Sequence, residues 1–295
     1  MRQLENRAVD LLWSLWTELG VPGTVRHHQQ LLMDPEPLIV FTPSLAATDP
    51  RLMELVFDWC RTNAALISKQ RIAAIAKTSP EGVTGALERF NGALALHGVK
   101  WLPAGSPESF TPERQKMSPS FERTALLRLR MRCLAGVSIR AEVLTMLLCS
   151  EGKPVSVDEL TVSGVSRRSV ERVVEELIES RFLTVQGKTR GRRFQLAGRQ
   201  AFVTFIQENR SIELPKPVNW HLVFDSICLL NSMAQSDLSE SLQRIEAVKL
   251  RGELAERMVA LNQPIPPVLS GKQDAADQII TWGHERITDW CEGRL

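Results

Sequence analysis

The side chains in this chain that are best suited to binding chemistry are basic and hydroxyl residues gathered in two short runs. The first run consists of Ser166, Arg167, Arg168, Ser169 and Arg172. The second run consists of Lys188, Thr189, Arg190, Arg192 and Arg193. Such side chains donate hydrogen bonds to phosphate oxygens and base edges, and clustered positive charge suits a polyanion because binding releases counterions. We therefore expect these ten residues to contact double-stranded DNA.

Three other fragments resemble catalytic or metal-binding motifs, but each lacks an essential part. The adjacent histidines at 27–28 have no Cys or carboxylate cluster beside them, which is typical of a solvated loop. The segment 283–288 begins like a zinc-peptidase helix, but Thr288 stands where the second His is required. The segment 187–189 resembles the end of a phosphate-binding loop, but Phe182 stands where the first Gly is required. We therefore expect no metal, no cofactor and no enzymatic activity.

The first run lies at the start of the third of three predicted helices. The first helix covers residues 139–149 and the second begins near Ser156. A tight turn containing Gly164 follows, and Ser166 is then a good cap for the third helix. The core stripe of that helix is predicted to be Val170, Val173, Val174, Leu177 and Ile178. The basic side chains fall on the opposite face, at the helix end where free N–H groups suit an anion.

The second run lies on a predicted β-hairpin. Residues 182–185 and 192–196 alternate apolar and polar side chains, as strands do, and Gly187 and Gly191 bracket the turn between them. No acidic residue occurs between Arg181 and Arg193. The pattern predicts a basic hairpin directly after the third helix.

Three helices followed by a basic hairpin form a winged helix-turn-helix, and this segment resembles the DNA-binding domain of bacterial winged-helix regulators of the MarR and ArsR type. The resemblance covers roughly a fifth of the chain. It implies that the third helix enters the major groove and that the hairpin lies on phosphates or in the minor groove. Winged helices also serve as protein-interaction modules, and four glutamates lower the net positive charge of the third helix. DNA binding and protein binding therefore both remain possible uses of this segment. These glutamates are Glu171, Glu175, Glu176 and Glu179.

The totals describe an ordinary globular chain. It has 295 residues, 43% hydrophobic residues and a formal charge of +2, so contact with nucleic acid must be local. Its five cysteines are scattered and form no CxxC pair, which favours reduced thiols in the core of a cytoplasmic protein. No apolar run is long enough to span a membrane, and acidic residues interrupt the N-terminal apolar segment, which is therefore predicted to be a structural helix.

The composition shifts along the chain predict a mainly helical protein with four segments. They are an N-terminal helical domain (1–99), a Pro-rich linker (100–119), the winged helix-turn-helix with a preceding helix (120–196) and a C-terminal helical domain (197–295). The preceding helix carries arginines that we expect to reach DNA backbone or acidic residues of a partner: Arg123, Arg128, Arg130 and Arg132. Residues 49–77 also fit a degenerate second helix-turn-helix, although a plain helical packing role is favoured.

These features together predict a transcriptional regulator, specifically a repressor that covers an operator as a homodimer. The C-terminal helical domain is larger than sequence-specific DNA recognition requires, so we expect it to mediate dimerisation or partner binding. The organisation loosely resembles regulators and antitoxins of bacterial defence and toxin–antitoxin operons. The alternative is an antitoxin or scaffold whose winged helix binds a protein. A weaker hypothesis is an effector pocket lined by Trp220, Phe224 and Trp282.

Overall fold

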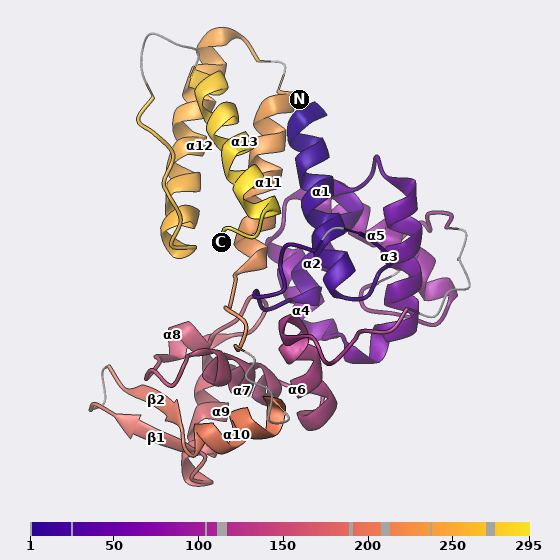
Figure 1. Cartoon of the computed structure of the whole chain (residues 1–295). Coiled ribbons are helices and arrows are strands. Elements are labelled where there is room, and N and C mark those ends of the chain that lie inside the picture. The colour runs from indigo at the N-terminus through magenta and orange to yellow at the C-terminus, as the bar shows by residue number, and fades with distance from the viewer. Residues whose placement is uncertain are drawn as a thin grey trace.

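A computed structural model describes residues 2–24, 26–103, 105–110, 117–188, 191–207, 213–236, 238–269 and 275–295. Within these ranges the chain forms thirteen α-helices and one two-stranded antiparallel sheet (Figure 1). The predicted mainly helical class is therefore confirmed. None of the helices in the described ranges combines the length and the apolar composition that crossing a bilayer requires.

Eight helices make up a large helical body. They are α1(Arg2–Glu18), α2(Pro35–Leu45), α3(Pro50–Asn63), α4(Lys69–Thr78), α5(Glu81–Leu96), α11(Trp220–Gln235), α12(Glu240–Ala260) and α13(Ala275–Cys291). Side-chain caps define several of their starts: the side chains of Asp49, Ser68 and Asn219 each accept a backbone N–H of the first turn.

One hydrophobic core joins the first five helices to the last three. Four tryptophans are fully buried in it, Trp16, Trp59, Trp220 and Trp290, and the ring of Trp16 meets that of Trp59 edge-on at 5.3 Å. Helix α1 lies beside α11 and α13 (Figure 1). The predicted segment 1–99 thus shares its apolar interior with residues 220–291 of the predicted segment 197–295, whereas α10(Arg199–Gln207) packs into a second core. The domain boundaries themselves stay a prediction.

A smaller unit lies below this body in Figure 1. It comprises α6(Leu127–Ala135), α7(Ile139–Cys149), α8(Val157–Leu160), α9(Arg167–Glu179), β1(Leu183–Gln186), β2(Arg193–Leu196) and α10(Arg199–Gln207). It has a second core, to which α9 contributes Val170, Val173, Val174 and Leu177. The predicted stripe of α9 is confirmed, with Ile178 at its half-buried edge.

The hairpin keeps its register by burying one face. Leu183, Phe194 and Leu196 are buried, and Val185 pairs with Phe194 across the ladder. Phe194 also exchanges two backbone hydrogen bonds with Val155 (2.7 and 2.9 Å), so the segment before α8 extends the sheet. The hairpin is consequently attached to the helices at its base.

The histidine pair at 27–28 does not form a solvated loop, so this prediction was wrong for His28. His28 is fully buried, with its ring nitrogens 2.7 Å from the Ser14 hydroxyl and 2.7 Å from the Trp290 carbonyl oxygen. Burial lowers the pKa of His28 to about 4, so the ring is neutral near pH 7. The side chain joins α1 to α13, and only His27 is exposed.

The cysteines behave as the sequence predicts. Cys60, Cys149, Cys228 and Cys291 are buried, and only Cys133 is exposed. Burial raises the pKa of the Cys149, Cys228 and Cys291 thiols to about 12, which keeps them protonated. These four thiols are small core residues.

Candidate nucleic-acid interface

The start of α9 is fixed by a hydroxyl cap. The Ser166 side chain accepts a hydrogen bond from the Ser169 backbone N–H (3.3 Å), and the two hydroxyl oxygens are 2.8 Å apart. Both serines are therefore occupied in holding the first turn. Their contribution to an interface is to orient this helix end, where backbone N–H groups and the helix dipole favour a negatively charged ligand.

The basic side chains of α9 differ in how they are engaged. Arg167 forms ion pairs with Asp158 of α8 and with Glu171 one turn later (2.9 Å to Glu171). Arg168 and Arg172 are exposed and form no hydrogen bond or ion pair with the described part of the chain. Residues four apart share one helix face, so these two guanidinium groups make one free basic stripe on the first turns of α9.

The hairpin arginines are paired with carboxylates of their own chain. Arg192 pairs with Glu175 of α9 (2.6 Å) and lies over the Phe194 ring, and Arg193 pairs with Glu159 (3.1 Å). Exposed pairs of this kind contribute about 0–1 kcal/mol, so exchanging a carboxylate for a phosphate costs little. Lys188 is exposed and has no ionic partner among the described residues, while Thr189 and Arg190 lie outside the described residues.

The structure brings the two basic runs onto neighbouring elements. The ion pair between Arg192, directly before β2, and Glu175 links the hairpin to the middle of α9, so the hairpin flanks the helix that carries Arg168 and Arg172. Acidic residues adjoin this surface as well: Glu175 is paired with the hairpin, and Glu176 is paired with Arg140 (2.8 Å). The two basic runs on the N-terminal turns of α9 and the hairpin thus have carboxylates beside them.

The arginines on and just before α6 are engaged within the chain, so the expectation that they reach DNA backbone or a partner was wrong. Arg123 donates to the carbonyl oxygens of Thr17 and Glu18 (2.8 and 2.9 Å). Arg130 donates to the carbonyl of Ile206 (2.6 Å), and Arg128 and Arg132 are buried. An amphipathic pattern predicts the spacing of such arginines along a helix. It does not identify the carboxylates elsewhere in the chain with which they pair.

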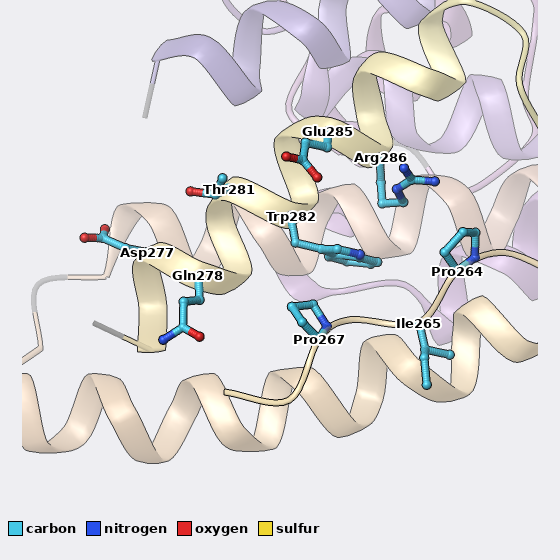
Figure 2. A pocket seen from close by; sticks show the side chains of 9 residues that line it. All are labelled: Pro264, Ile265, Pro267, Asp277, Gln278, Thr281, Trp282, Glu285 and Arg286. Carbon is cyan, nitrogen blue, oxygen red and sulfur yellow. The ribbon is translucent and has the colours of Figure 1, made fainter. Parts of the chain in front are cut away.

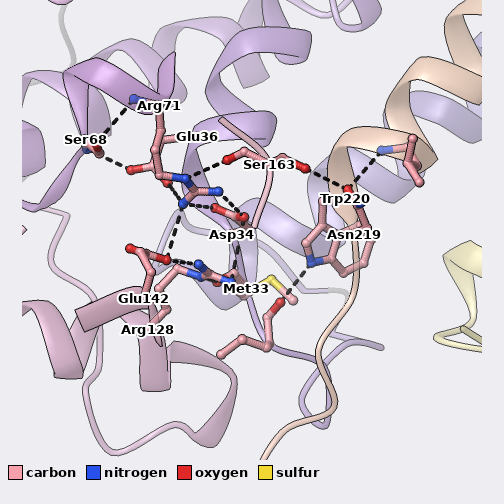
Figure 3. A network of polar contacts seen from close by, with 12 residues as sticks. Met33, Asp34, Glu36, Ser68, Arg71, Arg128, Glu142, Ser163, Asn219 and Trp220 are labelled. Carbon is pink, nitrogen blue, oxygen red and sulfur yellow. Dashed lines mark hydrogen bonds and ion pairs between the residues drawn. The ribbon is translucent and has the colours of Figure 1, made fainter. Parts of the chain in front are cut away.

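Six buried side chains form an ion network between the helical body and the smaller unit, and Figure 3 labels five of them: Asp34, Glu36, Arg71, Arg128 and Glu142. The members of this buried ion network are Asp34, Glu36, Arg71, Arg128, Arg132 and Glu142. Arg71 of α4 binds Asp34 (2.6 Å) and Glu36 (2.6 Å). Arg132 of α6 joins Glu36 (2.7 Å) to Glu142 (2.6 Å), and Arg128 also pairs with Glu142.

The network is balanced, with three guanidinium groups and three carboxylates. Burial alone would raise the pKa of Asp34, but Arg128 and Arg71 outweigh burial and hold the pKa well below its usual range. Burial likewise opposes ionisation of Glu142, and Arg128, Arg132 and Arg71 together lower its pKa. Asp34 and Glu142 are therefore ionised near neutral pH, and their charge depends on the neighbouring guanidinium groups.

The network also holds the turn that precedes α9. Arg71 Nε donates to the backbone carbonyl of Ser163 (2.9 Å), and the Ser163 hydroxyl donates to Asn219 Oδ1 (2.9 Å), the cap of α11 (Figure 3). A Cβ on Gly164, whose φ is +78°, would lie 2.8 Å from the Arg71 carbonyl oxygen. The α8–α9 turn is thus fixed between α4 and α11, and α9 is oriented by the body. No feature of the local sequence pattern indicates this contact.

The one arginine of α4 is not available to a second basic surface over residues 49–77. Arg71 is buried in the ion network, and the backbone N–H of Ser68 at the start of α4 donates to Glu36 Oε1 (2.8 Å). The α4 end that a helix-turn-helix would present is covered by this chain's own carboxylate. The packing role favoured from the sequence agrees with this arrangement.

The aromatic residues expected to line an effector pocket do not meet. Trp220 and Phe224 stack in the core, whereas Trp282 borders a groove of about 840 Å³ between α13 and the segment after α12 (Figure 2). Pro264 and Pro267 face Trp282 across the groove, and Glu285 lies at its rim. The prediction of a pocket lined by all three aromatic residues is therefore wrong.

No group of three or more His, Cys, Asp or Glu side chains in the described ranges is placed to hold a metal ion. Comparisons of the chain with protein-family models, with curated proteins and with solved structures give no match. The geometry of the chain itself therefore carries the functional argument.

Proposed function

We propose that this protein is a double-stranded DNA-binding transcriptional regulator, acting as a homodimeric repressor on an operator, and that α7, α8, α9 and the hairpin are its winged helix-turn-helix. One observation carries the proposal. Arg168 and Arg172 are exposed and unpaired, among the described residues, on the first turns of a capped helix, and a basic hairpin is ion-paired to that same helix. The resemblance to MarR- and ArsR-type regulators supports the same reading.

In the proposed complex, α9 enters the major groove by its N-terminal end. Arg168 and Arg172 donate to base edges or adjacent phosphates, and guanidinium groups suit the paired acceptors of guanine. Lys188, Arg190, Arg192 and Arg193 of the hairpin hold phosphate or the minor groove. Arg167 changes partner from Asp158 to phosphate. The attachment of the α8–α9 turn to the body limits the reorientation that binding would otherwise require.

The test is the electrophoretic mobility of operator DNA selected by the protein from genomic fragments. Arg168→Ala with Arg172→Ala is expected to weaken binding to the preferred site by about 1–3 kcal/mol, roughly 5- to 150-fold. Lys77→Ala, which removes an exposed cation on α4, is the matched control and should leave affinity unchanged. Equal affinities for the double variant and the control would reject the α9 assignment.

The second candidate function is an antitoxin or scaffold whose winged helix binds a partner protein. Its support is electrostatic: Arg167, Arg192 and Arg193 are already paired with carboxylates of the chain. A protein partner of mixed charge fits such a surface better than a duplex does. Co-purification of a partner, lost with Arg168→Ala and Arg172→Ala, together with no DNA affinity even at low salt, would favour this candidate.

A further inference from the structure

The exposed apolar side chains of this protein are unevenly distributed. Of the fourteen large exposed apolar side chains among the described residues, seven lie between Leu238 and Val268. They are Leu238, Leu242, Ile245, Val248, Val259, Ile265 and Val268. Isolated exposed apolar residues are normal, but half of the exposed large apolar side chains falling within one short stretch points to an interaction surface.

Helix α12 is apolar on two opposite faces. Ala247, Leu250, Leu254 and Met258 are buried against the body. On the other side, Ile245 is 62% exposed, Val248 is 57% exposed and Val259 is 72% exposed. α12 lies on the outer side of the last three helices, away from α1 (Figure 1), so no described element covers this second face.

The chain after α12 widens the apolar face. It turns back along the helix, where Arg251 Nε donates to the Pro267 carbonyl oxygen (2.7 Å). Ile265 and Val268, which is 82% exposed, therefore lie along the edge of α12 on which Arg251 sits. We call the exposed apolar side chains of these two adjacent segments the α12 face: Leu242, Ile245, Val248, Val259, Ile265 and Val268.

We propose that the α12 face binds the α12 face of a second copy of this chain, with the two helices antiparallel and crossing at Gly252. Helical residues at equal distances from a crossing point lie at the same level, so Ile245 of one copy meets Val259 of the other, twice. Gly252 has no side chain, and a Cβ built there would meet nothing within 4 Å in the single chain. This position permits close approach of the two backbones.

Charge complementarity selects the antiparallel arrangement. Lys249 and Glu256 lie on the same edge of the α12 face, nearly equidistant from Gly252, so each Lys249 lies opposite Glu256 of the second copy. Two opposite-charge pairs therefore flank the apolar contact. A parallel pair would instead bring Arg244 next to Lys249 of the second copy, which is repulsive. The contact is independent of DNA binding, because α12 is remote from α9 (Figure 1).

The experiment measures the mass of the full-length chain by light scattering after gel filtration, without DNA. The expected mass is twice 33.1 kDa for the wild type. Ile245→Glu with Val248→Glu should give 33.1 kDa, with an unchanged circular dichroism spectrum showing that the variant is folded. Leu96→Glu, at an exposed apolar position on α5, is the control and should keep the doubled mass.

A charge-exchange series tests the orientation. Lys249→Glu alone should raise the dissociation constant of the dimer at least fivefold, and Lys249→Glu combined with Glu256→Lys should restore it. A wild-type mass of 33.1 kDa at 50 µM, or a doubled mass in the Ile245→Glu, Val248→Glu variant, would overturn the proposal. Absence of rescue by the exchanged pair would overturn the antiparallel arrangement. The inference rests on the homodimer of the proposed function, so a monomeric wild type would overturn that homodimer as well. DNA binding by α9 is tested separately, because these readouts do not involve DNA.

Discussion

Arginine side chains occupy two contrasting environments in this protein. Arg71, Arg128 and Arg132 are buried against carboxylates, whereas Arg168 and Arg172 are exposed without a partner among the described residues. Arginine suits both roles because its planar guanidinium group stays charged when buried and also matches phosphate and base edges. The buried arginines hold the helices of the fold together, and the exposed arginines are accessible to a ligand.

Removing one buried arginine leaves the buried carboxylates only partly compensated. Arg71→Met is therefore expected to lower the free energy of unfolding by about 3–5 kcal/mol, because Asp34 and Glu36 each lose one of their arginine partners. Equilibrium unfolding in urea measures the change. Lys77→Met, on the same helix but exposed, is the matched control and should stay within about 0.5 kcal/mol of the wild type. Equal losses for both variants would contradict the role of the network.

His28 makes stability depend on pH. The unfolded side chain titrates at its ordinary pKa of 6.5 and the folded one at about 4, so the unfolded state binds more protons between these values. The contribution of the neutral ring is complete above pH 6.5 and is lost as the pH falls toward 4, amounting to about 3 kcal/mol. Urea unfolding of wild type and His28→Gln should show a stability difference that shrinks across this window. A difference independent of pH would contradict the assignment.

The residue-scale errors of the sequence predictions share one physical cause. The local pattern places Arg128 and Arg132 on a helix and His28 in a loop, and neither pattern contains Glu36, Glu142 or Trp290. The partners of these groups come from distant parts of the chain and are known only once the fold is known. The exposure of Arg168 and Arg172 on the outer face of α9, in contrast, could be predicted from local helix periodicity.

At the scale of elements, α9 and the hairpin act as one surface because an ion pair joins them. Glu175 holds Arg192 at 2.6 Å and also places a negative charge where a phosphate would bind. Glu175→Gln should therefore tighten DNA binding by about two- to fivefold, since it frees Arg192 and removes repulsion. Mobility-shift titration measures this, and Glu88→Gln on α5 is the control. Weaker binding by Glu175→Gln would show that the ion pair is needed to position the hairpin.

The hairpin arginines should contribute to affinity without contributing to sequence preference. Arg192→Ala with Arg193→Ala is expected to reduce the slope of log binding constant against log salt by roughly one to two units. Specific and unrelated DNA should lose affinity to a similar extent. An unchanged salt slope would place the hairpin away from the phosphates.

The elements themselves were largely predictable. Alternating apolar residues and two bracketing glycines indicate the hairpin, and the apolar stripe with Ser166 as cap indicates α9. The helix before the winged segment begins later than the predicted segment 120–196 does: a 3-10 turn covers Thr124–Leu126 and α6 starts at Leu127. Arg123, just before that turn, donates instead to the Thr17 carbonyl oxygen at the end of α1. The sequence pattern does not predict that the α8–α9 turn packs between α4 and α11.

At the scale of the whole molecule, the body is formed by both ends of the described chain. Cys291 of α13 contacts the Arg7 carbonyl oxygen of α1, and Trp220 of α11 donates to the Leu32 carbonyl (2.9 Å). The fragment 1–196 should therefore fail to unfold cooperatively and should bind a hydrophobic dye, because α11 and α13 no longer cover its apolar residues. Thermal melts by circular dichroism compare it with the full chain. A sharp, native-like transition of the fragment would show that the N-terminal helices are self-sufficient.

This arrangement has a consequence for the protein as it is made. Synthesis proceeds from the N-terminus at roughly 5–20 residues per second, so α1 to α5 emerge well before the helices that complete their interior. During that interval the apolar surface around Trp16 and Phe41 stays exposed to solvent and prone to aggregation. A ribosome-associated chaperone should therefore engage the nascent chain until α13 emerges, and slowing translation ahead of α11 should lower the soluble yield.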